Sequence, residues 1–161
     1  MFTIRPRRAW GAVAPTGTPT QQPRSAVHTL VVHHTAGSRP TTYEDARQEM
    51  RNIQRMHQRD RGWTDIGYHL VIDGAGRVWE GRSLDVVGAH THMNNTGTIG
   101  VSFMGNYENH KLSARQLAAY AALRLRLRAK GFRIQQVKGH RQMPHNSTAC
   151  PGRNVMKALR L

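Results

Sequence analysis

The chain has 161 residues, 38% of them hydrophobic, and a formal net charge of +15 at pH 7. This length fits one globular domain with its own core, and no apolar run is long enough to span a bilayer. A charge of this size attracts polyanions, but the lack of zinc-finger spacing, aromatic-rich RNA-binding motifs and a helix-turn-helix pattern argues against specific nucleic-acid recognition.

The first 26 residues are predicted to form an N-terminal extension and a loop ahead of a core at residues 27–161. Their basic start, MFTIRPRRAWGAVAP, lacks the apolar stretch of a secretory signal peptide, so we expect synthesis in the cytoplasm. Residues 14–25 are rich in Pro, Thr and Gln, a composition typical of a loop.

Two adjacent histidines lie near the end of the first predicted strand, residues 27–35. Neighbouring side chains in a strand point to opposite faces of the sheet. His33 and His34 therefore cannot both serve the same site.

Residues 41–60 have the spacing of an amphipathic helix. Thr41 or Thr42 is its expected N-cap, and Ala46 and Met50 recur on its apolar face. Residues 68–82 predict a hairpin about the turn DGAG, with a further strand at 98–107 and a short one at 134–138.

Residues 113–131 give the clearest helix, capped by Ser113 and ended by Gly131, and residues 153–161 predict a last one. The apolar face of the first of these helices is expected to comprise Leu117, Tyr120, Ala121 and Leu123–Leu127. Strands mixed with helices predict an α/β fold, a single domain whose central mixed β-sheet is flanked by helices.

Metal ligands are concentrated in the segment GHRQMPHNSTACPG, which holds His140, His145 and the single cysteine, Cys150. Cys150 precedes a proline that suits the first turn of a helix, and a helix N-terminus stabilises the thiolate that binds metal. A histidine at a strand end, such as His33, would complete two His and one Cys, a donor set typical of catalytic zinc. The alternative is a set of scattered surface histidines and a buried thiol.

Several motifs, in order, resemble the type 2 N-acetylmuramoyl-L-alanine amidases, which include peptidoglycan recognition proteins and phage lysozyme-amidases. They are VVHHTAG, RGWTDIGYHLVIDGAGRVWEGR, VGAHTHMNNTGTIGVSFMGNY, GHR and TACPG, preceded by IRPRRAWGA. The resemblance covers nearly the whole chain and implies one amidase domain, residues 1–161, with a zinc site at one edge of a substrate groove.

By this resemblance, one catalytic Zn²⁺ is held by His33, His140 and Cys150. The loop between the last two ligands is about two residues longer than in familiar members of the family, which leaves His145 as an alternative to His140. His34 is expected to be structural or to support the ligands from behind.

Two further residues match catalytic positions of the family. Tyr68 would bind or polarise the attacking water, and Thr148 would donate a hydrogen bond to the substrate carbonyl. The alternative for Tyr68 is that its ring packs in the core, and the alternative for Thr148 is that its hydroxyl serves a turn or a helix cap. Glu80 is the nearest candidate for a carboxylate base, and the alternative is that it only braces its strand. The proton donor stays open between water, His34 and Tyr68.

The resemblance also implies a set of substrate-binding residues. His57, His90 and Asn95 would line a muropeptide groove. The pair Gly62 and Trp63 would accompany recognition of meso-diaminopimelate stems. Arg82 would grip the carboxylate of that side chain, a task for which a guanidinium is suited. The alternatives are a core aromatic for Trp63 and a surface salt bridge for Arg82.

We therefore expect a zinc-dependent peptidoglycan hydrolase, a phage endolysin or a bacterial cell-wall amidase, that acts on the wall after release. The alternatives are a non-catalytic muropeptide-recognition module, against which the complete ligand set argues, and a regulatory binder of another protein. We expect a monomer without a transmembrane segment, and its charge would hold it to anionic wall polymers or lipopolysaccharide.

Overall fold

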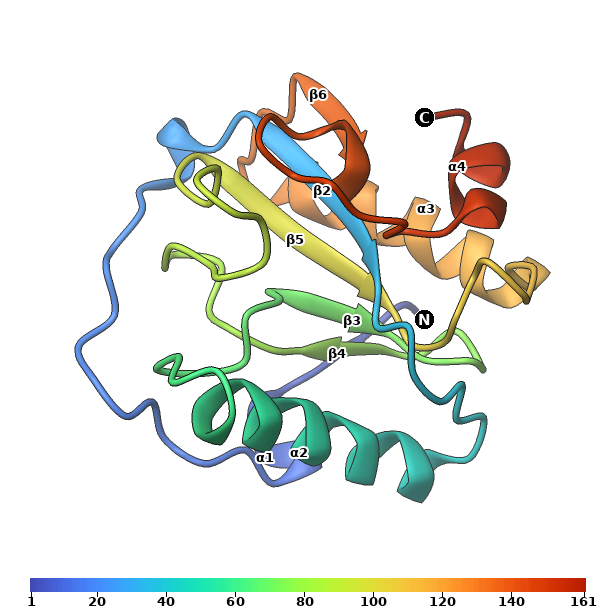
Figure 1. The fold of residues 1–161 in the computed structure, drawn as a ribbon, viewed down its shortest axis with the longest axis horizontal. Coiled ribbons are helices and arrows are strands. Elements are labelled where there is room, and N and C mark those ends of the chain that lie inside the picture. The colour runs from blue at the N-terminus through green and yellow to red at the C-terminus, as the bar shows by residue number, and fades with distance from the viewer.

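A six-stranded sheet in the order β1-β4-β3-β5-β2-β6 forms the centre of the computed structural model, which describes residues 1–161. β3 and β4 pair antiparallel and the other neighbours pair parallel, so the sheet is mixed, as predicted. β2 and β5 run side by side through the middle of the molecule (Figure 1). The strands are β1 (Ile4–Arg5), β2 (Thr29–His34), β3 (Leu70–Ile72), β4 (Val78–Glu80), β5 (Thr98–Phe103) and β6 (Gln136–Gly139).

The helices begin where the sequence places caps. The Thr42 hydroxyl accepts a hydrogen bond from the Asp45 N–H at the start of α2, and Ser113 and Gln116 form a capping box at the start of α3. The α-helices are α1 (Arg7–Trp10), α2 (Tyr43–Arg59), α3 (Ala114–Ala129) and α4 (Arg153–Leu159), with 3-10 helices η1 (Arg24–Ala26) and η2 (His140–Gln142). None of the helices combines the length and the apolar character that crossing a membrane requires.

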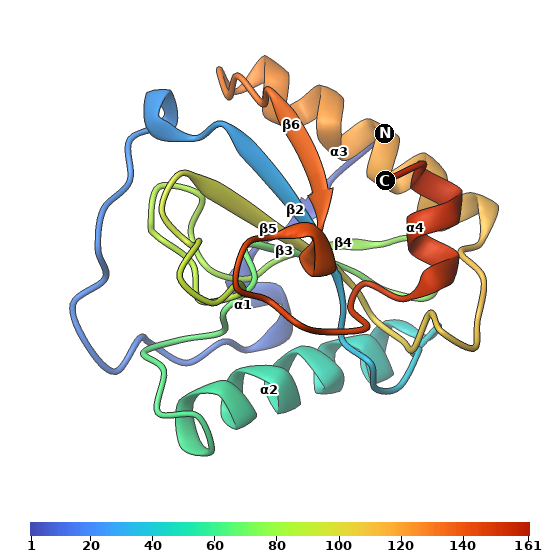
Figure 2. The same ribbon diagram turned by 45° about the horizontal axis from the view of Figure 1, so that its top comes forward.

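The sheet separates two apolar cores, with α3 on one side and α2 on the other (Figure 2). Leu30 and Val32 of β2 belong to the core that contains Leu123 of α3. Val71 of β3 belongs to the core that contains Met50 of α2. Because side chains alternate along a strand, His33 of β2 faces the α2 side.

The N-terminal residues are part of the sheet and of its α2-side core. β1 pairs parallel with β4, and Trp10 of α1 is fully buried and donates its indole N–H to the Glu80 carbonyl oxygen at 2.7 Å. A strand of two residues and a helix of four residues have no recognisable period, so the sequence pattern gave no sign of them.

Leu125 corrects the predicted apolar face of α3. Its side chain is 70% exposed, whereas Leu123 and Leu127 are buried. Residues four apart lie on the same face of a helix, but a residue two positions along is turned roughly 200° away. Ala121 is also exposed, and Leu117 lies at the edge of the buried face.

Candidate metal centre and adjoining groove

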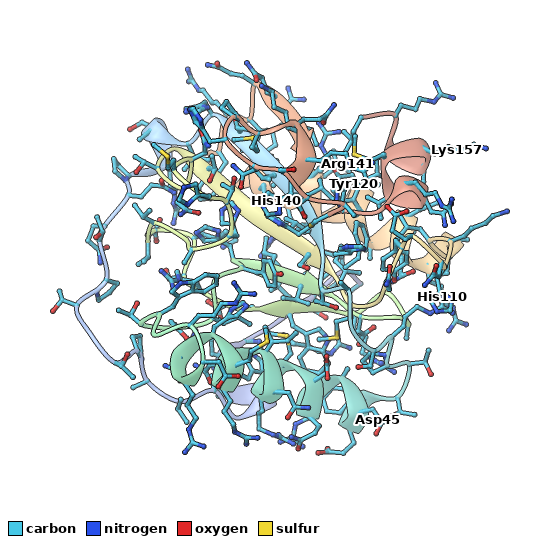
Figure 3. All side chains as sticks on the ribbon, in the orientation of Figure 1. Asp45, His110, Tyr120, His140, Arg141 and Lys157 are labelled. Carbon is cyan, nitrogen blue, oxygen red and sulfur yellow. The ribbon has the colours of Figure 1, made fainter.

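Three potential metal ligands meet where neighbouring strands end. His33 lies near the end of β2, His140 begins η2 directly after the parallel strand β6, and Cys150 lies in the loop before α4. One ligand atom from each of the three lies within 4.8 Å of the others. His140 lies toward the middle of the molecule in Figure 3, while Asp45 and Lys157 are at its outer edge. The carboxyl ends of parallel strands are a common place for a site in such sheets.

The two ring nitrogens of His33 have different neighbours. Nδ1 lies 3.6 Å from the Cys150 Sγ, and Nε2 lies 2.9 Å from the Nδ1 of His90. His90 in turn places its Nε2 3.1 Å from the Thr98 hydroxyl, which donates to the Asn95 carbonyl oxygen at 2.8 Å. A nitrogen that binds metal keeps its lone pair, so ligation through His33 Nδ1 requires the proton on Nε2, where His90 accepts it.

His140 has a similar partner. Its Nε2 lies 2.8 Å from the Oδ1 of Asn146, and the amide nitrogen of Asn146 donates to the carbonyl oxygens of His92 and Pro144. These bonds orient Asn146 so that its Oδ1 accepts the proton of His140 Nε2, which leaves the lone pair of His140 Nδ1 for a cation. The alternative ligand, His145, is exposed and is not part of the cluster.

This donor set fits Zn²⁺. Burial lowers the pKa of His33 well below its ordinary value and also lowers the pKa of His140, so both rings are neutral with a lone pair at pH 7. Burial raises the pKa of the Cys150 thiol to about 12, although the His34 backbone N–H donates to its sulfur at 3.4 Å. A divalent cation would offset the cost of ionising this thiol, and two imidazoles and one thiolate leave a fourth position open.

His34 is held on the side of the strand opposite to His33. Its Nδ1 accepts a hydrogen bond from the Tyr107 backbone N–H at 3.1 Å. The ring is buried and satisfies a backbone donor of the loop after β5. This is the structural arrangement that strand alternation allows for the second histidine of the pair.

The two residues with predicted catalytic roles each adjoin one of the ligands, Tyr68 beside His33 and Thr148 beside Cys150. Tyr68 is half-buried with its ring centroid 5.3 Å from that of His33, and burial raises the pKa of its hydroxyl. Thr148 is exposed, and its hydroxyl accepts a hydrogen bond from the Cys150 N–H at 3.1 Å. Tyr68 is thus a neutral O–H donor beside the ligands, and Thr148 shapes the turn that presents Cys150.

A groove of about 360 Å³ adjoins the cluster. Trp63 forms part of its wall, packed between the ring of His57 at 4.6 Å and the Arg61 guanidinium at 5.3 Å. Four other residues of the site also line the groove. Three of them, His90, Asn95 and His140, are predicted site residues, and the fourth is Asn146.

His57, Asn95 and Gly62 shape the segments around this groove. The His57 Nδ1 accepts from the Gly67 N–H at 2.9 Å, and burial lowers the pKa of His57 to about 4. The Asn95 Oδ1 accepts from the N–H groups of His90 and Thr91. Gly62 has a φ of +67°, which favours glycine at the turn before Trp63. Sequence motifs do not reveal the contacts that His57 and Asn95 make with the backbone.

Arg82 and Glu80 are not brought to the metal cluster or the groove. Arg82 is 8% exposed, and its guanidinium donates to the carbonyl oxygens of Ile66, Val87 and Asp65 at 2.9–3.1 Å. It lines a separate cleft of about 110 Å³. The Glu80 carboxylate accepts from the Arg7 backbone N–H at 3.1 Å. Glu80 therefore holds the N-terminal segment, a structural role that differs from the bracing of its own strand expected as the alternative to a base.

Sequence reasoning missed Thr98 and Asn146, the residues that orient His90 and His140. Thr98 begins β5 and resembles any β-branched strand residue, and Asn146 lies in the longer loop between His140 and Cys150. His69 was missed too; its Nδ1 accepts from the Gly100 N–H, and its Nε2 donates to the Val86 carbonyl oxygen. Spacing gives no signal for such contacts, because each joins segments that only the fold brings together.

The comparisons with known proteins agree with this architecture. A family model described as N-acetylmuramoyl-L-alanine amidase matches residues 23–153. Peptidoglycan-recognition protein SC2 of Drosophila simulans is 36% identical over 160 residues, which cover 98% of this chain and 85% of that protein. The N-acetylmuramoyl-L-alanine amidase of Mus musculus is 37% identical over 165 residues, covering 98% of this chain but 30% of its own length.

Solved structures share the fold across almost the whole chain. Peptidoglycan recognition protein-LE, in complex with tracheal cytotoxin (monomeric diaminopimelic acid-type peptidoglycan), has a TM-score of 0.90 at 30% identity, over 98% of this chain and 92% of that one. The chain belongs to the N-acetylmuramoyl-L-alanine amidase family that includes the peptidoglycan recognition proteins.

Proposed function

We propose that the chain is a zinc-dependent amidase that cleaves the bond between N-acetylmuramic acid and the L-alanine of the stem peptide. Membership of the family gives it a function of the peptidoglycan-binding or amidase type. The observation that carries the finer proposal is the complete donor set of His33, His140 and Cys150 beside the groove. A binder has no need of three converging metal ligands, each of whose histidines is oriented by a further hydrogen bond.

In the proposed reaction, His33, His140 and Cys150 hold Zn²⁺, which when bound supplies a Lewis acid and makes water more acidic. Tyr68 keeps its hydroxyl proton at neutral pH because burial raises its pKa, so it donates a hydrogen bond beside the ligands. The Thr148 hydroxyl accepts from the Cys150 N–H, and its own proton is left to donate to the substrate carbonyl oxygen.

The substrate we propose is peptidoglycan with meso-diaminopimelate stems. Trp63 offers an aromatic wall packed on His57, and Asn95 and His90 also line the groove. A relative at 30% identity is described in complex with diaminopimelic acid-type peptidoglycan, which supports this class of stem. The expectation of a phage or bacterial lytic enzyme stays a prediction, since the relatives reported above come from an insect and a mammal.

The test is mass spectrometry of the products from a defined diaminopimelate-type muropeptide, with zinc-loaded and chelator-treated protein. We expect an L-alanine-led peptide from the zinc-loaded protein and none after chelation. Cys150→Ser is the matched variant, because it keeps the volume of the side chain and removes the thiolate. Zinc-loaded protein that leaves the muropeptide intact would overturn the amidase proposal.

A second candidate is muropeptide recognition without cleavage. It is favoured by the name of the insect relative and by the lining of the groove, in which His140 is the one residue of the metal-ligand group. Calorimetric titration of the muropeptide into Cys150→Ser measures this binding separately. Binding by wild type and by the variant, with no product from either, would establish recognition in place of hydrolysis.

A further inference from the structure

The positive charge of the chain is concentrated in its last third. Residues 109–161 contain twelve Lys and Arg and no Asp or Glu, so they carry +12 of the net +15. The first 108 residues hold the other twelve cations and all nine acidic residues. Such segregation creates a local field that a uniformly basic protein lacks.

The outer face of α3 displays part of this charge without any structural partner. Arg124, Arg126 and Arg128 are exposed, and none of the seven ion pairs of the protein includes them. Between them lies Leu125, which is 70% exposed. Arg124 and Arg128, four residues apart, lie on one flank of this exposed surface, and Arg126 lies on the other. Folding gains nothing from these unpaired like charges, and an exposed leucine among them has no role in the core.

Beside this face lies a groove with a volume of about 540 Å³. Its apolar floor exposes Ala121 and Leu125 and, in part, Ile134, whereas Leu127 and Phe132, which also line it, are buried. Its rim carries Arg124, Arg128 and Arg133. The guanidinium of a further arginine, Arg24, lies 5.5 Å from the centre of the Phe132 ring. Cations around an apolar floor match a ligand that has phosphate groups at one end and hydrocarbon at the other.

This groove is distinct from the metal centre. Leu30 of β2 lines it, whereas His33, three residues along the same strand, points to the other face of the sheet. α3 and α2 lie on opposite sides of the sheet (Figure 2). A ligand held on the α3 face would leave the groove beside Trp63 open.

We propose that this groove and the adjoining face of α3 bind the surface of an anionic phospholipid bilayer. The arginines of the rim contact lipid phosphates, and Leu125 and the apolar floor contact the acyl region. A soluble polyanion, such as a nucleic acid or a polyphosphate, would use the charge but gain nothing from the exposed leucine and the apolar floor. The proposal does not rest on the amidase activity.

The test is sedimentation of the full chain with vesicles of phosphatidylcholine alone or of phosphatidylcholine and phosphatidylglycerol at about 7 to 3. We expect binding to the anionic vesicles and none to the neutral ones. Arg124→Gln/Arg128→Gln should weaken the binding about 25-fold, from about fivefold for each arginine near the surface. The matched control is Arg55→Gln/Arg59→Gln on α2, which removes the same charge from exposed positions and should change binding by less than about twofold.

Leu125→Ser separates a lipid surface from a soluble polyanion. Its side chain is exposed, so the variant should fold like wild type, which circular dichroism checks. We expect weaker binding to anionic vesicles and unchanged binding to polyphosphate. The proposal is overturned if anionic vesicles do not bind, if the α2 control weakens binding as much as the α3 pair, or if Leu125→Ser leaves vesicle binding unchanged.

Discussion

The Nε2 of His33 lies 2.9 Å from the Nδ1 of His90, and this contact links the metal centre to the wall of the groove. Sequence motifs assign His90 to substrate binding, but its ring is buried and both of its nitrogens have protein partners. We therefore interpret His90 as a positioning residue that keeps the proton of His33 on Nε2 and the lone pair on Nδ1.

The hydroxyl of Thr98 should control zinc affinity through His90. Thr98→Val keeps the side-chain shape but removes the acceptor of the His90 Nε2 proton, and we expect zinc to bind about 10–100-fold more weakly. Thr98→Ser keeps the hydroxyl and should bind zinc like wild type. Competition with a chelating indicator measures the affinity, and ¹⁵N shifts of the His33 ring report its tautomer. Equal zinc affinity in both variants would contradict this role.

Substitution of the two neighbouring histidines should have different effects. His33→Ala removes a ligand, so we expect the purified protein to lose its zinc. His34→Ala should retain zinc but leave the buried Tyr107 N–H without an acceptor, at a cost of about 1–3 kcal/mol in the free energy of unfolding. Metal analysis and urea denaturation of both variants check these results. Loss of zinc from His34→Ala would show that the division of roles is wrong.

Much of the fold could be predicted from sequence because its main elements are periodic. The Thr42 and Ser113 caps and the hairpin of β3 and β4 lie where local patterns place them. The exposed Leu125 lies in a run of alternating Leu and Arg that mixes the helical faces, and the run gives no hint of which leucine points outward. Tertiary packing decides which leucine is exposed, and the local sequence pattern does not contain this information.

For the site, the ligands could be predicted because the family motifs include them, while strand alternation alone left His33 and His34 equivalent. The partners of the ligands could not be predicted. Thr98 acts on His33 only through His90, across 65 residues of sequence, and Asn146 lies in a loop of variable length. Hydrogen bonds between distant segments have no sequence period, so they emerge only from the fold.

Acid should destabilise the protein through buried neutral histidines. Burial lowers the pKa of His57 to about 4 from its ordinary value of 6.5, so between these values the unfolded chain binds a proton that the folded chain does not. The free energy of unfolding should then fall as pH decreases from 6.5 to 4, by about 3 kcal/mol for this group, and level off below. The pKa of His69 is lowered to about 4 for the same reason and adds a similar loss.

His57→Asn isolates the contribution of His57 to this loss of unfolding free energy. The amide oxygen of Asn can still accept a hydrogen bond from the Gly67 N–H, but the amide does not titrate. Urea unfolding of the chelator-treated variant at several pH values gives its free energy of unfolding as a function of pH. Between pH 4 and 6.5 the slope of this dependence should be lower than that of wild type by about 1.4 kcal/mol per pH unit. A wild-type slope in His57→Asn would mean that another group carries the effect.

Arg82 should prove to stabilise the fold more than it selects the stem peptide. Arg82→Met keeps the length of the side chain but deprives the carbonyl oxygens of Ile66, Val87 and Asp65 of their donor, so we expect a loss of about 3 kcal/mol in the free energy of unfolding. Arg55→Met, at an exposed position of α2, should be neutral. If Arg82 instead grips diaminopimelate, its variant would unfold like wild type and bind diaminopimelate-type and lysine-type muropeptides equally. Urea denaturation and muropeptide titration of the same samples distinguish the two roles.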